Sequence, residues 1–369
     1  MALVLTQDET MLVDSARGLF EREAPVTAFR ALRDGGEPLA WDRSLYGKLA
    51  ENGLVAPNVA EQDDGIGMGI SAAGLILEQS GHVLAASPLL SAAISATLIA
   101  CAASNQQRAD LLGPIVSGER VVAPALDEAV RHDPALLQTK AEKSGDGWSL
   151  TGRKTAVIDG FDAASYIVSA MADGAPALFL VEKGASGLGV ERFAAVDSRN
   201  YAKLALSGTP ATMLGDSDAS AAIAAGLDLG RALLAAELLG AADEAFTRTV
   251  SYLKERRQFD RVIGSFQALQ HRAARMYSRL DIARGVVLKA LRALDEGNDD
   301  ATWLASLSKA TMTRLARDVM MEAMQMHGGI GMTDDFDVGL FVKRAQSAGE
   351  LLGDDHFQTE RLAAGKWGL

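Results

Sequence analysis

An unbroken apolar stripe over residues 266–294 limits the folds open to this chain. The spacing predicts one helix of about 29 residues, roughly 43 Å long, that ends at Glu296-Gly297-Asn298. A stripe of this length needs facing helices, so we expect a four-helix bundle within residues 216–369. The apolar residues recur at alternating steps of three and four, at Phe266, Leu269, Ala273, Met276, Leu280, Ala283, Val287, Ala290 and Leu294.

The chain divides into a helical block, a strand block and a second helical block. Over 119–215, β-rich runs alternate with turn dipeptides such as Asp159-Gly160 and Asp173-Gly174, which is typical of antiparallel strands. The predicted fold class is α+β and multi-domain: an N-terminal α-helical domain (1–118), a middle antiparallel β-domain (119–215) and a C-terminal four-helix bundle (216–369). The clearest predicted strands are Trp148–Thr151, Ser165–Met171 and Ala177–Val181.

Composition excludes several classes of protein. Lys plus Arg is 36 and Asp plus Glu is 48, and a net charge of −12 disfavours nucleic acid or an anionic membrane as the main partner. The single cysteine, Cys101, rules out an intramolecular disulfide framework, and its apolar surroundings predict a buried, inert thiol. Met1–Thr10 lacks the features of a signal peptide, and Val83–Ala103 is expected to be a buried helix rather than a membrane span. We therefore expect a cytoplasmic protein.

Common catalytic motifs are missing from the sequence. It has no Gly-x-Gly-x-x-Gly after a strand, no Gly-Lys-Ser/Thr loop and no Gly-x-Ser-x-Gly elbow. No motif therefore supports hydrolase chemistry. No motif supports a metal site either, because the five histidines are scattered at positions 82, 132, 271, 327 and 356.

Two segments have a composition that the packing of a helical bundle does not require. The first, Lys254–Gln267, places three arginines around an aromatic residue, which suits bidentate binding of phosphate; taken alone, it also fits a solvated helix end. The second, Gln325–Thr333, has three glycines that leave backbone amides open to a planar ligand; taken alone, it also fits a helix cap and a turn.

Together, these two segments resemble the acyl-CoA dehydrogenase family. The matching residues are Glu255-Arg256, Phe259, Ile263 and Gln267 in the first segment and Gln325, Gly328-Gly329 and Gly331 in the second. Gly53–Pro57 with Gly65–Gly67, and Leu150–Lys154 with Asp159-Gly160, resemble further blocks of the same family.

The resemblance implies a cofactor, a reaction and partners. Family members bind FAD between the middle domain and the bundle, and they dehydrogenate an acyl-CoA thioester at its α and β carbons with a carboxylate as base. Electrons then pass to an electron-transferring flavoprotein. Arg231 would contact substrate. The site would need an oligomer, since the residues facing the FAD of a neighbouring subunit would be Arg256, Gln258, Phe259, Gln267, Gln325, Gly328, Gly329 and Gly331.

The sequence departs from the family pattern where the chemistry should occur. Ala156 and Ile158 replace the usual Trp and Thr beside the flavin, and Ala123–Glu128 replaces another flavin motif. The two usual positions of the catalytic base hold Leu352 and Gly230. The carboxylates near these positions are Glu350, Asp354, Asp355 and Asp228, of which Glu350 and Asp354 are the candidate bases.

Three hypotheses remain open from the sequence. The chain is a subunit of a hetero-oligomeric acyl-CoA dehydrogenase, of the short type linked to steroid side-chain breakdown, and contributes to its partner's flavin site. Alternatively, it is an active homo-oligomeric dehydrogenase whose base is Glu350 or Asp354. The third hypothesis is a flavin-free helical scaffold. For the first two, we expect a dimer or a dimer of dimers formed through the C-terminal bundle.

Overall fold

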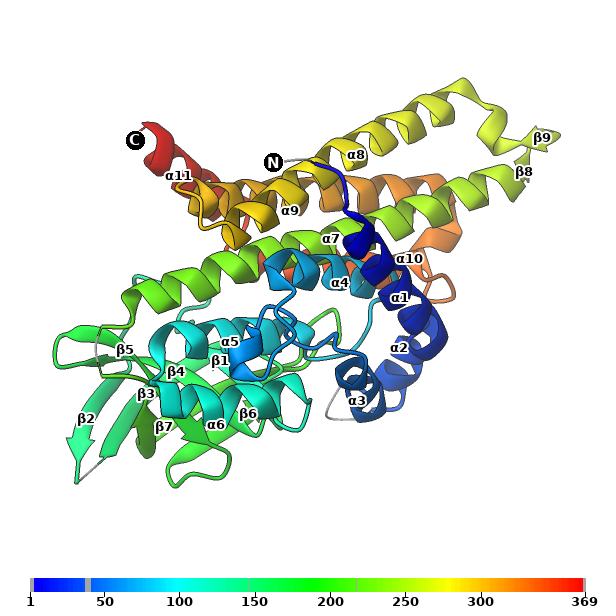
Figure 1. Ribbon diagram of the computed structural model, residues 1–369. Coiled ribbons are helices and arrows are strands. Elements are labelled where there is room, and N and C mark those ends of the chain that lie inside the picture. Colours follow the sequence, from blue (N-terminus) through cyan, green and yellow to red (C-terminus); the bar gives the residue numbers. More distant parts are fainter. Residues whose placement is uncertain (1–2, 37–40, 146, 217, 368–369) are drawn as a thin grey trace.

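The computed structural model describes residues 3–36, 41–145, 147–216 and 218–367, in the order helices, strands, helices (Figure 1). The first helices are α1 (Gln7–Glu23), α2 (Val26–Asp34), α3 (Arg43–Glu51), η1 (Glu61–Asp63), α4 (Gly69–Val83), α5 (Leu89–Ala102) and α6 (Asn105–Val116). The strands are β1 (Val122–Ala125), β2 (Lys140–Ser144), β3 (Gly147–Ile158), β4 (Ser165–Ala172), β5 (Ala175–Glu182), β6 (Leu188–Arg192) and β7 (Tyr201–Met213).

The second helical part contains α7 (Ser220–Glu255), α8 (Gln267–Asp295), α9 (Ala301–His327), α10 (Val338–Glu350) and α11 (Asp355–Trp367). A short hairpin of β8 (Arg257–Gln258) and β9 (Arg261–Val262) followed by η2 (Ile263–Ser265) joins α7 to α8, and η3 (Gly328–Met332) follows α9. The predicted fold class is confirmed, and α8 coincides with the apolar stripe. Its buried residues include Met276, Leu280, Ala283, Val287 and Ala290.

The strands form one seven-stranded sheet that is antiparallel except at one side. β3 pairs with β7, β4 with β5, and β6 with β7, all antiparallel. β1, however, runs parallel to β4, with Val122 opposite Ser165, and β2 meets β4 parallel at a single pair. The prediction of purely antiparallel strands is wrong there because β1 enters directly from the first helical part, whereas β4 follows the β2–β3 hairpin.

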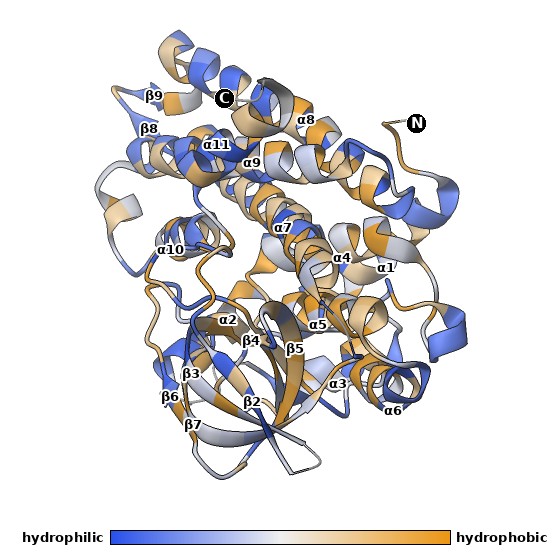
Figure 2. Ribbon diagram, turned by 90° about the vertical axis from the view of Figure 1, so that its left-hand side faces the viewer, coloured by the Kyte–Doolittle hydropathy of each residue, from blue (hydrophilic) through white to orange (hydrophobic). Residues whose placement is uncertain are grey.

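Helix α7 is the central element of the molecule. Its 36 residues are about 54 Å long, and Figure 1 shows it running from the strands to the β8–β9 hairpin. Leu233, Leu234 and Leu238 are fully buried. Small residues let α4 approach closely, since a side chain at Gly240 would collide with the Glu78 carbonyl. The hairpin and the sheet therefore lie at opposite ends of the molecule, as Figure 2 also shows.

Two expectations about the apolar N-terminal block need correction. Cys101 is exposed rather than buried, because it lies in the last turn of α5 on the side facing away from the core. Partial desolvation raises the pKa of its thiol, which keeps it protonated at neutral pH. The buried helix expected over Val83–Ala103 is interrupted after α4, and α5 is the buried part. Within the described ranges, no helix is long and apolar enough to cross a bilayer.

Asp159, at the end of β3, gives the fold a pH dependence. Its carboxylate accepts a hydrogen bond from Ser91 at 2.7 Å and is buried. Desolvation raises its pKa from 3.8 to about 6, although the Ser91 hydrogen bond opposes the shift. Because the pKa of Asp159 is higher in the folded state, protonation of this carboxyl stabilises the fold. The stabilisation amounts to about 3 kcal/mol; it is complete below about pH 3.8 and is lost as the pH rises through about 6.

We therefore expect the free energy of unfolding of the natural chain to fall between about pH 4 and pH 6.5. The variant Asp159→Asn should not show this fall. Urea denaturation across this range measures it. Asp173→Asn is the control, because Asp173 is an exposed aspartate on a turn of the same sheet. An unchanged slope in the Asp159 variant would show that this carboxyl is not the responsible group.

Candidate active site

A cleft of about 500 Å³ lies between the sheet and the end of α10. Its wall on the sheet side includes Thr155 and Ala156 of β3, and Glu350 and Leu352 line the opposite side. A smaller adjoining cavity of about 20 Å³, lined in part by Ile158 and Leu352, has room for little more than one water molecule. The cleft therefore corresponds to the place where the family resemblance predicts the flavin ring and the acyl group.

The two usual base positions pack against each other at this cleft. A Cβ atom built on Gly230 would lie 2.5 Å from Cδ1 of Leu352 and 2.9 Å from Cδ1 of Ile94. Leu352 therefore fills the space that a side chain at position 230 would need. Neither position supplies a proton acceptor, and the leucine leaves no room for one at the other position.

The turn that carries Leu352 is nevertheless strained and firmly held. Leu352 has a φ of 57°, a left-handed conformation that is costly for a residue with a branched side chain. Its carbonyl accepts hydrogen bonds from Nε of Arg231 at 3.2 Å and from Gln358 at 2.8 Å. Lys309 donates to the carbonyls of Gly349 and Gly353 at 2.7 and 3.3 Å. Burial lowers the pKa of Lys309 to about 7.

The candidate carboxylates near these positions have different surroundings. Glu350 is exposed, lines the cleft and accepts a hydrogen bond from Gln346 at 3.1 Å. Asp354 caps the start of α11 by accepting from the amide of Phe357 at 2.8 Å, and it lines a separate hollow on α9 and α10. Asp228 is buried and paired with Arg231 at 2.7 Å and Arg361 at 3.1 Å, so two cations share its charge.

Sequence reasoning missed a polar bridge from the sheet side to α7. Asp127 and His132 both line the cleft, and Nδ1 of His132 lies 2.7 Å from the Asp127 carboxylate. Nη2 of Arg231 lies 3.0 Å from Nε2 of the same imidazole. Because arginine can only donate, Nε2 accepts and the proton lies on Nδ1, where it is donated to Asp127. The five-residue spacing of an aspartate and a histidine after β1 was the signal available in the sequence.

Arg231, the predicted substrate contact, is the centre of this bridge. Its side chain is fully buried, and it reaches Asp228, Leu352 and His132 at once. Burial, together with the nearby charge of Arg361, lowers its pKa to about 10, so it remains charged at neutral pH. The structure thus places Arg231 behind the cleft wall, where its buried side chain bonds to Leu352 and His132, two residues that line the cleft.

The cleft wall differs from the family pattern at the positions beside the flavin ring. Ala156 and Ile158 present only apolar side chains where the family pattern has an aromatic ring and a hydroxyl. Of the polar groups nearby, Asp127 and His132 are bonded to each other and to Arg231. The cleft therefore lacks the aromatic ring and the hydroxyl group that the family pattern places beside the isoalloxazine half of FAD.

The Arg-rich and Gly-rich segments, called the distal motifs below (Arg256–Gln267 and Gln325–Gly331), lie at the other end of α7. Roughly 38 Å of helix separates Arg231 from Arg256 at 1.5 Å per residue. The second motif is attached to this end of α7 through His327, whose ring lies 4.5 Å, centroid to centroid, from that of Tyr252, four residues before Arg256. The distal motifs cannot reach the cleft of their own chain.

The distal motifs do fit the diphosphate half of FAD. Gly331 is buried, but the other predicted contacts are exposed, namely Arg256, Gln258, Phe259, Gln267, Gln325, Gly328 and Gly329. Phe259 is 87% exposed, and an exposed aromatic side chain of this size is typical of a surface that binds a ligand or another protein. A Cβ at Gly328 or Gly329 would meet nothing within 4 Å, so a ligand from outside has open access to this backbone. Arginines beside an open backbone are the usual means of binding a diphosphate.

Comparison with known proteins assigns the chain to a family. Its residues 6–119 match the profile "Acyl-CoA dehydrogenase, N-terminal domain", and residues 220–366 match "Acyl-CoA dehydrogenase, C-terminal domain". The chain belongs to the acyl-CoA dehydrogenase family, oxidoreductases that act on CH–CH groups.

Several relatives match over nearly the whole chain. The solved Tcur3481-Tcur3483 steroid acyl-CoA dehydrogenase, a variant, is 33% identical, with a TM-score of 0.89 and 97% of both chains covered. The ChsE4-ChsE5 complex from Mycobacterium tuberculosis is 26% identical, with a TM-score of 0.88 and 99% of both chains covered. Acyl-CoA dehydrogenase IpdE2 of Mycolicibacterium smegmatis is 28% identical, with 98% of this chain and 99% of the relative covered.

Proposed function

We propose that this chain is the subunit of a hetero-oligomeric acyl-CoA dehydrogenase that helps to bind FAD but supplies no catalytic base. The observation that carries the proposal is the packing of Leu352 against Gly230, which fills both usual base positions with hydrocarbon or with no side chain. A base must be a proton acceptor within hydrogen-bond reach of the α-carbon's proton.

FAD is the cofactor of the family, and when bound it supplies the two-electron oxidation of the acyl group. In this proposal, Arg256, Gln258 and Gln325 of this chain hold the diphosphate and adenosine half of an FAD whose ring lies in the cleft of a partner subunit. The exposure of these side chains and their distance from the chain's own cleft support this assignment. The chain's own cleft binds no flavin ring.

The partner is a second member of the same family, and the assembly forms through the C-terminal helices. Two relatives support this choice, since ChsE4-ChsE5 is a complex of two proteins and Tcur3481-Tcur3483 is a steroid acyl-CoA dehydrogenase. We propose a bulky acyl-CoA thioester, such as one with a sterol side chain, as substrate and an electron-transferring flavoprotein as acceptor. The domain boundaries proposed from the sequence, at residues 118/119 and 215/216, lie between α6 and β1 and between β7 and α7.

A second function, an active homo-oligomeric dehydrogenase, has one observation in its favour. Glu350 is a carboxylate that lines the cleft two residues before Leu352, so it is the base to test first. Asp354 is the other candidate, although it caps α11.

Coexpression tests the proposal. A tagged form of this chain should pull down a coexpressed acyl-CoA dehydrogenase homologue from the same organism, and the pair should dehydrogenate acyl-CoA thioesters. Recovery of this chain as an active species in the absence of any homologue would overturn the proposal. Light scattering on each sample reports the assembly, which we expect to exceed the 38.8 kDa monomer in both cases.

A further inference from the structure

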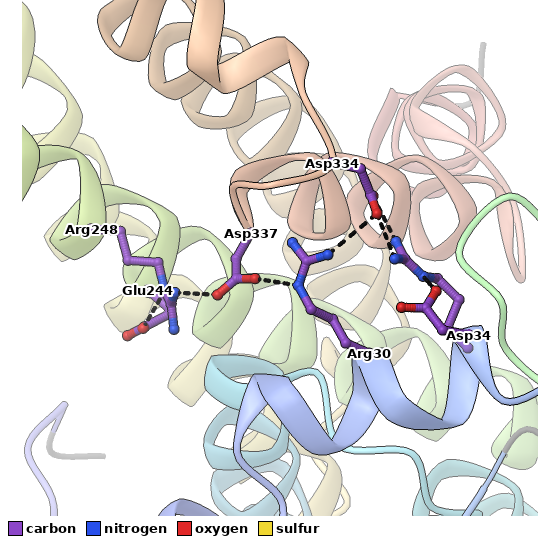
Figure 3. Close-up of polar contacts among 7 residues, drawn as sticks. Arg30, Asp34, Glu244, Arg248, Asp334 and Asp337 are labelled. Atoms are coloured by element: carbon purple, nitrogen blue, oxygen red, sulfur yellow. Dashed lines mark hydrogen bonds and ion pairs between the residues drawn. The ribbon is translucent and has the colours of Figure 1, made fainter.

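A continuous row of ion pairs connects the N-terminal helices to the segment that follows η3. The row, called the ionic ladder below, consists of Arg33, Asp334, Arg30, Asp337, Arg248 and Glu244 (Figure 3). It starts on α2, crosses the loop between η3 and α10, and ends on α7. Three parts of the chain more than 80 residues apart in sequence are thus joined by charge.

The contacts to the loop have strong geometry. Arg33 donates two parallel hydrogen bonds to Asp334, Nη1 to Oδ1 at 2.7 Å and Nη2 to Oδ2 at 2.6 Å. Arg30 reaches the same carboxylate at 3.3 Å and donates from Nε to Asp337 at 2.8 Å. The other oxygen of Asp337 accepts from Arg248 at 2.7 Å. The bonds from Arg33 lower the pKa of Asp334 to about 2, so it stays ionised at any working pH.

The loop held in this way directly follows one of the distal motifs. Asp334 lies two residues after η3, which contains Gly328 and Gly329 with their open backbone. Ile330 and Met332 of η3 are exposed and contribute little packing of their own. Within the described chain, the loop is anchored by His327, which packs on Tyr252 and Phe336, and by the ladder. An ordered backbone binds a diphosphate better than a mobile one, because less conformational entropy is lost on binding.

We propose that Arg30 and Arg33 are positioning residues for FAD, and that through Asp334 and Asp337 they hold the loop after η3, and with it the Gly328–Met332 backbone, in its binding conformation. They touch no part of the nucleotide and act through the loop. The inference has two parts. The effect on FAD binding rests on the proposed function, whereas the ordering of the loop rests only on the contacts of the ionic ladder.

Hydrogen exchange of residues 328–337 tests the ordering arm in the chain alone, without flavin. In Asp334→Asn and Arg33→Ala, we expect exchange of this segment to quicken about three- to tenfold, the range that loss of one or two partly exposed ion pairs gives. Raising KCl from about 0.05 to 1 M should quicken exchange in the natural chain and do less in Asp334→Asn, since salt screens these charges.

The matched control is Glu182→Gln. Glu182 is 58% exposed and accepts from Arg120 of the sheet region at 2.5 and 2.6 Å, much as the 61% exposed Asp334 accepts from Arg33. The substitution Glu182→Gln removes a similar ion pair far from the loop, so hydrogen exchange of residues 328–337 should not change. Unchanged exchange in the Asp334 variant, or an equal change in the control, would overturn the inference.

The flavin arm is measured as flavin retained by the coexpressed complex after gel filtration. We expect Asp334→Asn and Arg33→Ala to retain less flavin, again by about three- to tenfold, and Glu182→Gln to retain as much as the natural chain. If exchange quickens while flavin retention stays the same, the positioning role is overturned. If Arg256→Ala then also leaves flavin unchanged, the failure lies in the proposed function rather than in the ladder.

Discussion

Purified without a homologue and assayed with acyl-CoA thioesters and an artificial electron acceptor, this chain should turn over at least about 100-fold more slowly than its complex with a catalytic partner. A positioned general base contributes about 10²- to 10⁴-fold to a rate. Here Leu352 and Gly230 occupy the two usual positions of that base and pack against each other. The initial rate per mole of this chain, measured for both preparations with FAD added, gives the comparison.

Three conservative variants identify the base if the chain alone proves active. Glu350→Gln, Asp354→Asn and Asp228→Asn each remove a carboxylate charge and keep the size of the side chain. Loss of activity in the Glu350 or Asp354 variant would establish the homo-oligomeric dehydrogenase and contradict our account. Asp228→Asn leaves Arg231 and Arg361 without their buried counter-charge, so the thermal stability of this variant has to be measured beside its rate.

The second large effect concerns flavin retention. In the complex, Arg256→Ala together with Gln325→Ala should weaken FAD binding about 10- to 150-fold, since one charge-assisted contact to a phosphate contributes roughly 1.5–3 kcal/mol. Both side chains are exposed at the far end of α7 from the cleft, so their loss should cost the fold little. Titration of the apo-complex with FAD, followed by flavin fluorescence, measures the dissociation constant.

Lys289→Ala is the control for this experiment. Lys289 is an exposed cation on α8 outside the distal motifs, and its removal changes the net charge as Arg256→Ala does. Equal weakening in both variants would indicate a general electrostatic effect, and an unchanged dissociation constant in the double variant would mean that Arg256 and Gln325 have a structural role only.

The sequence predicted most of the fold because its strongest signals are local. The stripe of α8 and the turn dipeptides between strands depend on residues a few positions apart, and these elements are confirmed. The parallel pairing of β1 with β4 was not predictable, since it joins segments separated by a hairpin. Cys101 was expected to be buried because hydrophobicity alone does not say which side of an apolar helix faces the core.

The candidate site divides in the same way. The distal motifs were found from their spacing, because each is a contiguous stretch of chain. The bridge from Asp127 through His132 to Arg231 was missed, since its two ends are about 100 residues apart and nothing local marks them as neighbours. The mutual packing of Gly230 and Leu352 is likewise a tertiary contact. The sequence showed that both positions lacked an acid, and the structure adds that one fills the space of the other.

The ratio of flavin to chain is the most direct test of the account. Absorption spectra of denatured samples give bound FAD, and amino-acid analysis gives each chain. We predict no more than a trace of flavin in this chain purified alone, and in the complex one flavin for each partner chain and none for the cleft of this chain. One flavin per chain in the homo-oligomer would contradict the account, and a complex without any flavin would favour the scaffold hypothesis instead.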